Sequence, residues 1–416
     1  MYKAITSNKL FQDTLIYGLT NALYTGLPLL LLPFLVVTLK PEDYGYVDLF
    51  RSISMVLVPV LGLSTVQSIG RFYFDLDKAT FKNFVSSIHI FLLCTTSVGL
   101  LITFFISPYL SPIFSNLLIA CILYFLFHQY IESLLIIYRI TNKPKVYLVM
   151  RVGQVVVELL LLFAAYILLE TIDWKFRVFP TILASMILAF VAFKKFKDLG
   201  YSLNFSKRLL QKALIYSSPL IVHMVAGYAL NIGDRFFIKY YLSDEDLGNY
   251  AVAYQIGMSI NFFYTSFNLA WTPTYFKWMK EKKVAAIMKV KRVIFISLPL
   301  LGVVVLVSWL VISELFINDT SYSVSNELVA IIILSYVLYS LYKFNANFFL
   351  FKKLTDKLSK YSLTAAIVSV ILNIVLIPSL GIMGAGLSTF FSFAVLFVLV
   401  SNGKAIVNKY DRDLLS

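Results

Sequence analysis

The chain has 416 residues, of which 59% are hydrophobic and only 14% charged, and its mean hydropathy is +0.82. A soluble domain carries about a quarter of charged residues, so this composition excludes an ordinary soluble protein and predicts a membrane protein. The net charge of +14 does not indicate nucleic-acid binding, because the basic residues occur in short segments between long apolar runs. Basic loops of that kind anchor the topology of a membrane protein.

The apolar runs predict an all-α fold with twelve membrane-spanning helices. A run of about 18 or more apolar residues crosses the bilayer as a helix, and the runs here are too long to be the strands of a barrel. We expect spans near residues 14–37, 47–69, 83–107, 112–137, 147–169, 179–193, 213–238, 249–276, 293–316, 325–351, 361–380 and 382–403. The basic segment 194–212 would then link two six-helix halves, residues 1–193 and 213–416.

Lysine and arginine are distributed unevenly about these spans. The segments on the side of the N-terminus hold 28 of the 36 basic residues, and the opposite side holds only Lys40, Lys175, Arg177 and Lys239. Cytoplasmic loops carry the excess of positive charge, so both termini are predicted to be cytoplasmic. The first apolar run has no small-residue cleavage site and is expected to remain as an anchor.

A short motif occurs twice. Residues 39–45 and residues 242–248, which lie 203 positions further on, share Leu, Glu, Asp and Gly at four of seven places. Residues 141–147 and 355–361 are also similar, at an offset of 214. Internal similarity in a transporter points to homologous halves. With six helices in each half, both halves would enter the membrane in the same orientation, which makes the repeat parallel.

Ionisable side chains inside the predicted spans are the candidate functional residues, because a charge within the bilayer is costly and usually faces a protein interior or a cavity. The cationic candidates for substrate binding are Arg51, Arg151, Arg235 and Lys343. The candidates for binding a coupling ion are Glu132, Glu158 and Asp234. Simple structural pairing, or snorkelling of the arginines to the interface, remains open for each of them.

The spacing of these residues predicts several contacts. Arg51 follows Asp48 by three positions and Glu132 follows His128 by four, so each pair shares a helix face. Arg151 and Glu158 are seven apart and are also expected on one face. A cationic cavity between the halves would bind an anionic substrate, because the guanidinium group matches phosphate oxygens.

Helix breakers are expected at equivalent places in the two halves. Pro28 and Pro33 fall in the first predicted helix, and Pro219, Gly227 and Gly233 fall in the seventh. Interrupted helices at matching positions are typical of transport sites. In contrast, the outward loops are too short to hold a catalytic site and no phosphate-cradling loop is present. We therefore expect no catalytic residue, cofactor or metal site.

Four stretches resemble a known family: residues 39–45, residues 231–238 continuing into 242–250, residues 270–275, and residues 372–378 followed by 381–386. In these the chain resembles Wzx-type flippases, the polysaccharide-exporter branch of the multidrug/oligosaccharidyl-lipid/polysaccharide (MOP) exporter superfamily. The resemblance implies a MATE-like fold. It also implies that Arg51 and Arg235 contact the pyrophosphate of the substrate.

The resemblance implies a function as well. Such proteins move an undecaprenyl-pyrophosphate-linked oligosaccharide, for example an O-antigen repeat unit, from the cytoplasmic to the periplasmic leaflet of the bacterial inner membrane by alternating access. Coupling to a proton or sodium gradient is expected, and so is work beside a polysaccharide polymerase and a chain-length regulator. Two alternatives remain open: a cation-coupled drug or metabolite antiporter of the multidrug-extrusion branch, and a membrane polymerase or ligase, which would need a large outward loop.

Overall fold

The structure is a computed structural model that describes residues 2–169, 171–202, 204–316 and 320–413, and all regular secondary structure within these ranges is helical. The helices are α1 (Tyr2–Thr38), α2 (Pro41–Val60), α3 (Thr65–Phe72), α4 (Lys78–Ile106), η1 (Ser107–Tyr109), α5 (Pro112–Ile140), α6 (Pro144–Leu168), α7 (Lys175–Asp198), α8 (Lys207–Tyr241), α9 (Asp244–Lys280), α10 (Val284–Phe316), α11 (Asn326–Phe351), α12 (Thr355–Leu380) and α13 (Ile382–Asp413). The predicted all-α class is confirmed.

Most of these helices are suited to a bilayer. Among the described residues, nine helices are long and apolar enough to cross a membrane, and the count rises to eleven when two bent pairs are each taken as one span. The pairs are α2 with α3 and the two segments of α8. The protein is therefore a multi-pass membrane protein. The remaining long helix, α9, is continuous but carries polar residues along its length.

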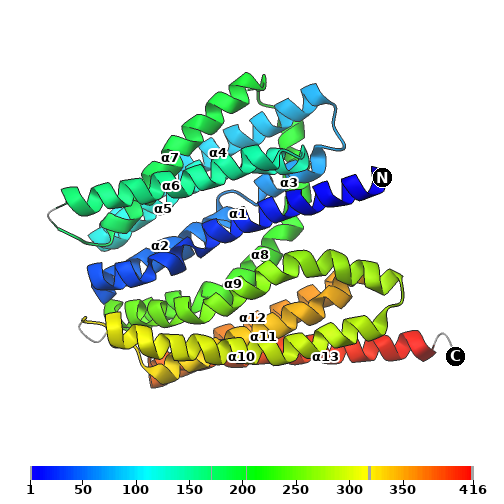
Figure 1. Cartoon of the computed structure of the whole chain (residues 1–416). Coiled ribbons are helices and arrows are strands. Elements are labelled where there is room, and N and C mark those ends of the chain that lie inside the picture. Colours follow the sequence, from blue (N-terminus) through cyan, green and yellow to red (C-terminus); the bar gives the residue numbers. More distant parts are fainter. Residues whose placement is uncertain (1, 170, 203, 317–319, 414–416) are drawn as a thin grey trace. The chain divides into compact units, whose positions relative to one another are not determined.

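One compact unit comprises Met1–Tyr24 and Tyr46–Val225, and α5 is its central helix (Figure 1). α5 packs against α3, α4, α6 and α7. The core includes Phe84, Ile88, Ile131 and Leu134, none of which is exposed. In contrast, α4 presents large apolar side chains outward, such as Phe104 at 71% exposed. This is the surface expected of a helix that faces lipid.

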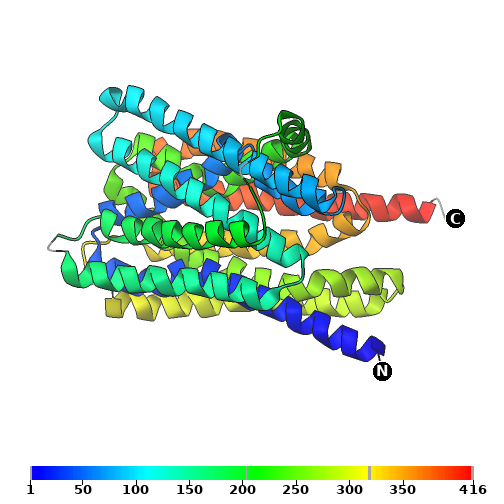
Figure 2. The same cartoon turned by 90° about the horizontal axis from the view of Figure 1, so that it is seen from above.

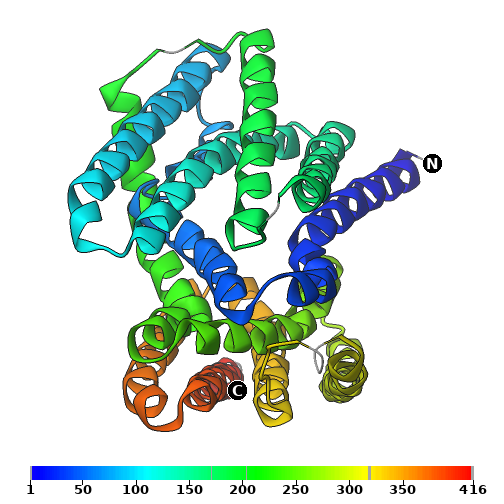
Figure 3. The same cartoon turned by 90° about the vertical axis from the view of Figure 1, so that its left-hand side faces the viewer.

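The other compact unit comprises Thr25–Gly45 and Ala226–Ser416, and α11 is its central helix. Figure 3 shows α12, α13, α11 and α10 end on and side by side in that order, and each neighbouring pair in this row is in contact. α9 packs against both α10 and α11. The last turns of α13 extend beyond the neighbouring helices (Figure 2).

The two units repeat the same packing order. Contacts connect α4 to α5, α5 to α7 and α7 to α6, and in the same way α10 to α11, α11 to α13 and α13 to α12. The buried share of the apolar windows of α4, α5, α6 and α7 is 22, 56, 33 and 50%, and for α10 to α13 it is 22, 56, 28 and 44%. In both series the first and third helices are less buried than the second and fourth. The two units therefore share one pattern of outer and central helices.

The predicted helix breaks are partly wrong. α8 bends by 48° between Ile221 and Met224, close to Pro219, as expected. α1 continues as one helix through Pro28 and Pro33. A proline inside a membrane helix can be accommodated when neighbouring groups satisfy the freed carbonyl, so its presence alone does not predict a break.

The second break is one that the sequence analysis did not predict. α2 and α3 meet at an angle of 59°, although one continuous span was expected over residues 47–69. Leu63 and Ser64 have φ values of 44° and 52°, in the left-handed region. A Cβ on Gly62 would lie 2.7 Å from Val58 O. Glycine therefore fits a turn too tight for another side chain.

The repeated motif has a structural explanation within the second unit. Its two copies form the α1–α2 and α8–α9 turns together with the first turns of α2 and α9. A Cβ on Gly45 would lie 2.9 Å from Gly248 N, and one on Gly248 would lie 1.7 Å from Pro41 O. The backbones of the two helix starts therefore approach so closely that glycine is required in both copies.

Candidate functional site

In the unit that contains α4 to α7, Arg151 lies at the centre of a polar network. Its Nη2 donates to the Glu132 carboxylate on α5, and its Nη1 lies 3.3 Å from Gln154 Oε1. Its guanidinium carbon lies 4.2 Å from the centre of the Tyr24 ring. His128 Nε2 lies 3.7 Å from Glu132 Oε1, so the predicted contact between these two side chains is confirmed.

Arg151 and Glu132 differ in access. The Glu132 side chain is 25% exposed, whereas that of Arg151 is only 6% exposed. The Arg151 Nε is buried and has no hydrogen-bond partner among the residues that the structure describes. Buried donors are rarely left without a partner. This nitrogen is therefore an unsatisfied donor within the Arg151–Glu132 network.

Glu158 belongs to a second, closed ion pair in the same unit. Arg177 Nη1 lies 2.6 Å from Glu158 Oε1, and Thr181 Oγ1 donates to the same oxygen at 3.0 Å. The expected span began near residue 179, whereas α7 begins at Lys175, so Arg177 lies in the first turn of the helix. Arg151 and Glu158 are both buried on α6, but each pairs with a different helix.

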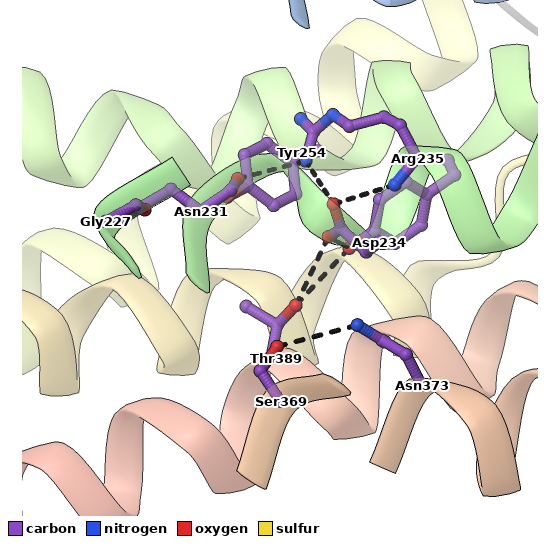
Figure 4. Close-up of polar contacts among 9 residues, drawn as sticks. Gly227, Asn231, Asp234, Arg235, Tyr254, Ser369, Asn373 and Thr389 are labelled. Atoms are coloured by element: carbon purple, nitrogen blue, oxygen red, sulfur yellow. Dashed lines mark hydrogen bonds and ion pairs between the residues drawn. The ribbon is translucent and has the colours of Figure 1, made fainter. Parts of the chain in front are cut away.

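In the second unit, Asp234 and Arg235 of α8 form an ion pair between neighbouring residues (Figure 4). Asp234 Oδ1 accepts from Arg235 N at 3.0 Å and from Arg235 Nη1 at 2.7 Å. Its Oδ2 accepts from the Tyr250 hydroxyl and, at 3.4 Å, from Thr389 Oγ1. The Arg235 guanidinium carbon lies 3.7 Å from the centre of the Tyr254 ring. Both charges are therefore compensated and held in fixed geometry.

Oxygen atoms from α12 and α13 lie beside this pair. Figure 4 shows Thr389, Ser369 and Asn373 on the side of Asp234 away from Arg235. Asn373 Nδ2 lies 3.5 Å from Ser369 Oγ, and Asn373 Oδ1 is buried with no hydrogen-bond partner in the described part of the chain. Carboxylate, hydroxyl and amide oxygens are the ligands that hard cations prefer. These uncharged groups border the Asp234 carboxylate, whose two oxygens already accept four hydrogen bonds.

Lys343 of α11 differs from these arginines. Its Nζ lies 2.8 Å from Asn261 Oδ1 on α9 and 4.7 Å from the centre of the Tyr339 ring. Among the described residues it forms no ion pair with a carboxylate, and it is half-buried. Lys343 is therefore a partly accessible cation whose partners are neutral.

Arg51 lies in α2 and is half-buried, as is Asp48, three positions before it. Its contact with substrate stays a prediction, as do the functional roles of the other candidates. No group of three or more His, Cys, Asp or Glu side chains that could hold a metal ion occurs in the part of the chain that the structure describes.

Sequence reasoning missed the neutral members of these networks. Arg151 lies over the Tyr24 ring and Arg235 lies over the Tyr254 ring. Asn261 and Asn268 of α9 accept hydrogen bonds from α11. A search for charged residues does not detect them. The available signal was the spacing of Asn261 and Asn268, which are seven apart in a predicted span and therefore lie on one face.

Comparison with known proteins identifies the family and the fold. The model of the polysaccharide biosynthesis protein family matches residues 10–279. A protein of the Lsg locus of Haemophilus influenzae is 22% identical over 313 residues, which are 74% of this chain and 76% of that protein. The family match covers more than half of the chain, and therefore shows family membership.

Two solved structures have similar folds. The lipid II flippase MurJ in an inward closed conformation superposes with a TM-score of 0.70 at 12% identity, covering 95% of this chain and 86% of that one. An inward-facing multidrug resistance MATE family transporter of the MOP superfamily gives 0.66 at 15% identity, covering 95% and 96%. The chain thus belongs to the polysaccharide biosynthesis protein family and shares the fold of these two solved membrane transporters.

Proposed function

We propose that the protein is a flippase that moves an undecaprenyl-pyrophosphate-linked oligosaccharide, such as an O-antigen repeat unit, from the inner to the outer leaflet of the bacterial cytoplasmic membrane by alternating access. Its membership of a polysaccharide biosynthesis family and a fold similar to that of a lipid II flippase support this proposal. The excess of basic residues on one side supports cytoplasmic termini. A polysaccharide polymerase and a chain-length regulator would act on the product.

The observation that carries the proposal is that cations occur inside the helices of both units. Arg151 and Arg235 are 5% and 3% exposed and each lies over a tyrosine ring. Lys343 is half-buried and has no carboxylate partner among the described residues. A pyrophosphate that leaves water needs charge-assisted hydrogen bonds to offset its desolvation. Lys343, whose described partners are neutral, can supply one of them.

The proposal includes twelve spans in two parallel six-helix repeats. The repeated packing order of α4–α7 and α10–α13 supports two equivalent halves. α9 would be the twelfth span. Its polar residues lower its apolar character, but several of them bond to α11 and are thus satisfied inside the unit. A helix whose polar groups are paired by neighbouring helices can stay in the membrane.

Coupling to a proton or sodium gradient would use a carboxylate in one of these networks. Asp234 is one candidate, because the uncharged hydroxyl of Thr389 lies 3.4 Å from its Oδ2. Glu132 is the alternative, since its side chain is 25% exposed. Glu158 is the third candidate, and Arg177 and Thr181 both donate to its Oε1.

The experiment that tests the function measures lipid-linked oligosaccharide and surface polysaccharide in a host that lacks the gene. We expect the lipid-linked repeat unit to accumulate, the surface polymer to disappear, and the intact gene to restore both. The Lys343→Gln variant, produced at normal levels, should restore them only poorly. Unchanged lipid intermediates and unchanged polymer, in a host without a redundant transporter, would contradict the proposal.

A cation-coupled antiporter for drugs or metabolites is the second candidate. The fold similarity to a MATE family transporter and the partly exposed Glu132 carboxylate favour it. Purified protein in proteoliposomes distinguishes the two functions. Gradient-driven movement of small cationic molecules, with no effect of the gene on lipid-linked oligosaccharide, would support the antiporter.

A further inference from the structure

A row of amide and hydroxyl side chains follows one face of α9 and contacts α11. In α9 the row consists of Asn261, Thr265, Asn268 and Thr272, at successive spacings of four, three and four residues. That spacing places all four on one face of a helix. In α11, Lys343 and Asn347 are four apart and face them. We refer to these six residues as the amide row.

The amide row is held together by hydrogen bonds between the two helices. Asn347 Nδ2 donates to Asn268 Oδ1 at 3.0 Å, and Thr272 Oγ1 donates to Asn347 Oδ1 at 2.9 Å. Lys343 Nζ donates to Asn261 Oδ1 at 2.8 Å. Asn347 is 1% exposed and uses both its amide nitrogen and its oxygen. Asn347 is therefore the structural member, which joins α9 to α11.

Asn261 and Asn268 have unused capacity. Both are half-buried, and in each the oxygen accepts hydrogen bonds while the amide nitrogen makes none with the residues that the structure describes. A side-chain amide can donate twice, so two donor groups are available along this face. Seven residues at 1.5 Å per residue place the two asparagines about 10.5 Å apart along the helix, a distance comparable to the length of a disaccharide.

The composition of the row indicates the chemistry of its ligand. Amide and hydroxyl groups offer both donors and acceptors, which suits the hydroxyl groups of an uncharged sugar. A polar group in an apolar span is costly when it lacks a partner, so leucine would serve simple helix packing better. Lys343, the cation of the amide row, lies at one end of it, in contact with Asn261. An anion bound to Lys343 would place its attached sugars along Asn261 and Asn268.

We infer that the amide row is a glycan-binding surface, on which Asn261 and Asn268 contact the sugars of the lipid-linked substrate and Lys343 contacts its pyrophosphate. This inference rests on the proposed function. It goes beyond that function by assigning the two parts of the substrate to different residues. The amides recognise the oligosaccharide, and the lysine recognises the carrier phosphate. Glycan recognition is thereby assigned to α9 and α11 of one unit.

Binding measurements on the full-length protein in nanodiscs test this division. The probes are lipid-linked oligosaccharide extracted from the host and undecaprenyl pyrophosphate without sugar. Loss of one or two sugar hydrogen bonds weakens binding by about five- to tenfold. Asn268→Ala and Asn261→Ala should therefore weaken binding of the oligosaccharide by that factor and leave binding of the bare carrier unchanged. Lys343→Gln should weaken binding of both probes.

Asn345→Ala is the matched control. Asn345 is another asparagine of α11, 2% exposed, and its amide nitrogen bonds to Ser401 Oγ at 3.0 Å outside the amide row. Its substitution should lower thermal stability without changing the ratio of the two affinities. Equal weakening of both probes by Asn268→Ala and Asn261→Ala would overturn the glycan-binding surface. Wild-type protein that binds neither probe would instead overturn the proposed function.

Discussion

The polar networks of the two units differ although their helices pack in the same order. In the unit with α4 to α7, Arg151 and Arg177 each pair with a glutamate on a neighbouring helix. In the unit with α9 to α13, Asp234 pairs within its own helix, and the partners of Lys343 among the described residues are neutral. A shared arrangement of helices therefore does not imply a shared distribution of charge.

This difference separates charges that stabilise the unit from charges that are available to a ligand. A buried arginine with its carboxylate already in contact contributes mainly to the structure of its unit. A lysine that contacts an amide and a ring remains attractive to an anion, because no negative charge offsets it locally. Substitution of a paired, buried charge should therefore lower stability more than transport. Substitution of Lys343 should lower transport more than stability.

The largest expected effect on stability follows from breaking the closed pair with Arg177→Gln. Removal of one member leaves the Glu158 charge buried without compensation, which costs about 3 to 5 kcal/mol. The thermal unfolding midpoint of the purified protein in detergent should fall sharply. The double variant Arg177→Leu with Glu158→Leu should recover much of the loss.

Lys175→Gln is the matched control for that prediction. Lys175 is two residues away and pairs with Asp173 at 3.3 Å, but both side chains are more than 40% exposed. An exposed pair of this kind is worth about 0 to 1 kcal/mol. Equal losses in Lys175→Gln and Arg177→Gln would show that burial of the second pair has no special effect.

Gly248→Ala should have the next largest effect. The new Cβ would lie 1.7 Å from Pro41 O, and a clash with backbone can be relieved only by moving a helix start. Overpacking of this kind costs about 1 to 3 kcal/mol. Gly227→Ala is the control, because no atom of the described side chains lies within 4 Å of a Cβ there. The better helix propensity of alanine should leave that variant as stable as the wild type or slightly more so.

Tyr322→Phe tests a smaller interaction in the same region. The Tyr322 hydroxyl donates to Leu39 O at 3.1 Å, at the start of the repeated motif. Loss of this bond should cost about 1 kcal/mol at neutral pH. Burial raises the pKa of the Tyr322 phenol, and Tyr44 and Asp43 add to the rise. The unfolded chain then loses this proton first, so the contribution of Tyr322 to stability falls as the pH rises above about 10.

The pH dependence gives that prediction a specific measurement. The difference in unfolding midpoint between wild type and Tyr322→Phe should shrink when the pH is raised from 8 to about 10.5, because phenylalanine has no proton to lose. A constant difference over this range would show that the hydroxyl of Tyr322 is not protected by burial as the structure indicates.

Sequence patterns predicted the class of the fold but not the partners of its charges. Long apolar runs are sufficient to locate spans, and the motif at residues 39–45 was correctly singled out by its recurrence. Spacing places Arg151 and Glu158 on one face of α6, yet each pairs with a residue nineteen positions away on a neighbouring helix. The rotation and offset of neighbouring helices decide such contacts, and no pattern within one helix contains them.

Errors in the predicted ends of helices also hid some contacts. α7 begins at Lys175, four residues before the expected span, and this shift turns Arg177 from a loop residue into a buried partner of Glu158. The amide row also escaped notice, since asparagine in an apolar run gives no charge signal. Its members become visible only when α9 and α11 are placed side by side.

The smallest effect on stability is expected for Lys343→Gln, and it is the most informative one. Because Lys343 has no carboxylate partner among the described residues, its removal leaves no opposite charge buried, and the unfolding free energy should change by less than about 0.5 kcal/mol. Export of the lipid-linked oligosaccharide should nevertheless fall at least about tenfold, as expected when a charge-assisted bond to phosphate is lost. Lys343→Arg, which keeps the charge, should retain part of the activity. A loss of stability as large as that of Arg177→Gln would place Lys343 among the structural charges and remove the distinction between the two units.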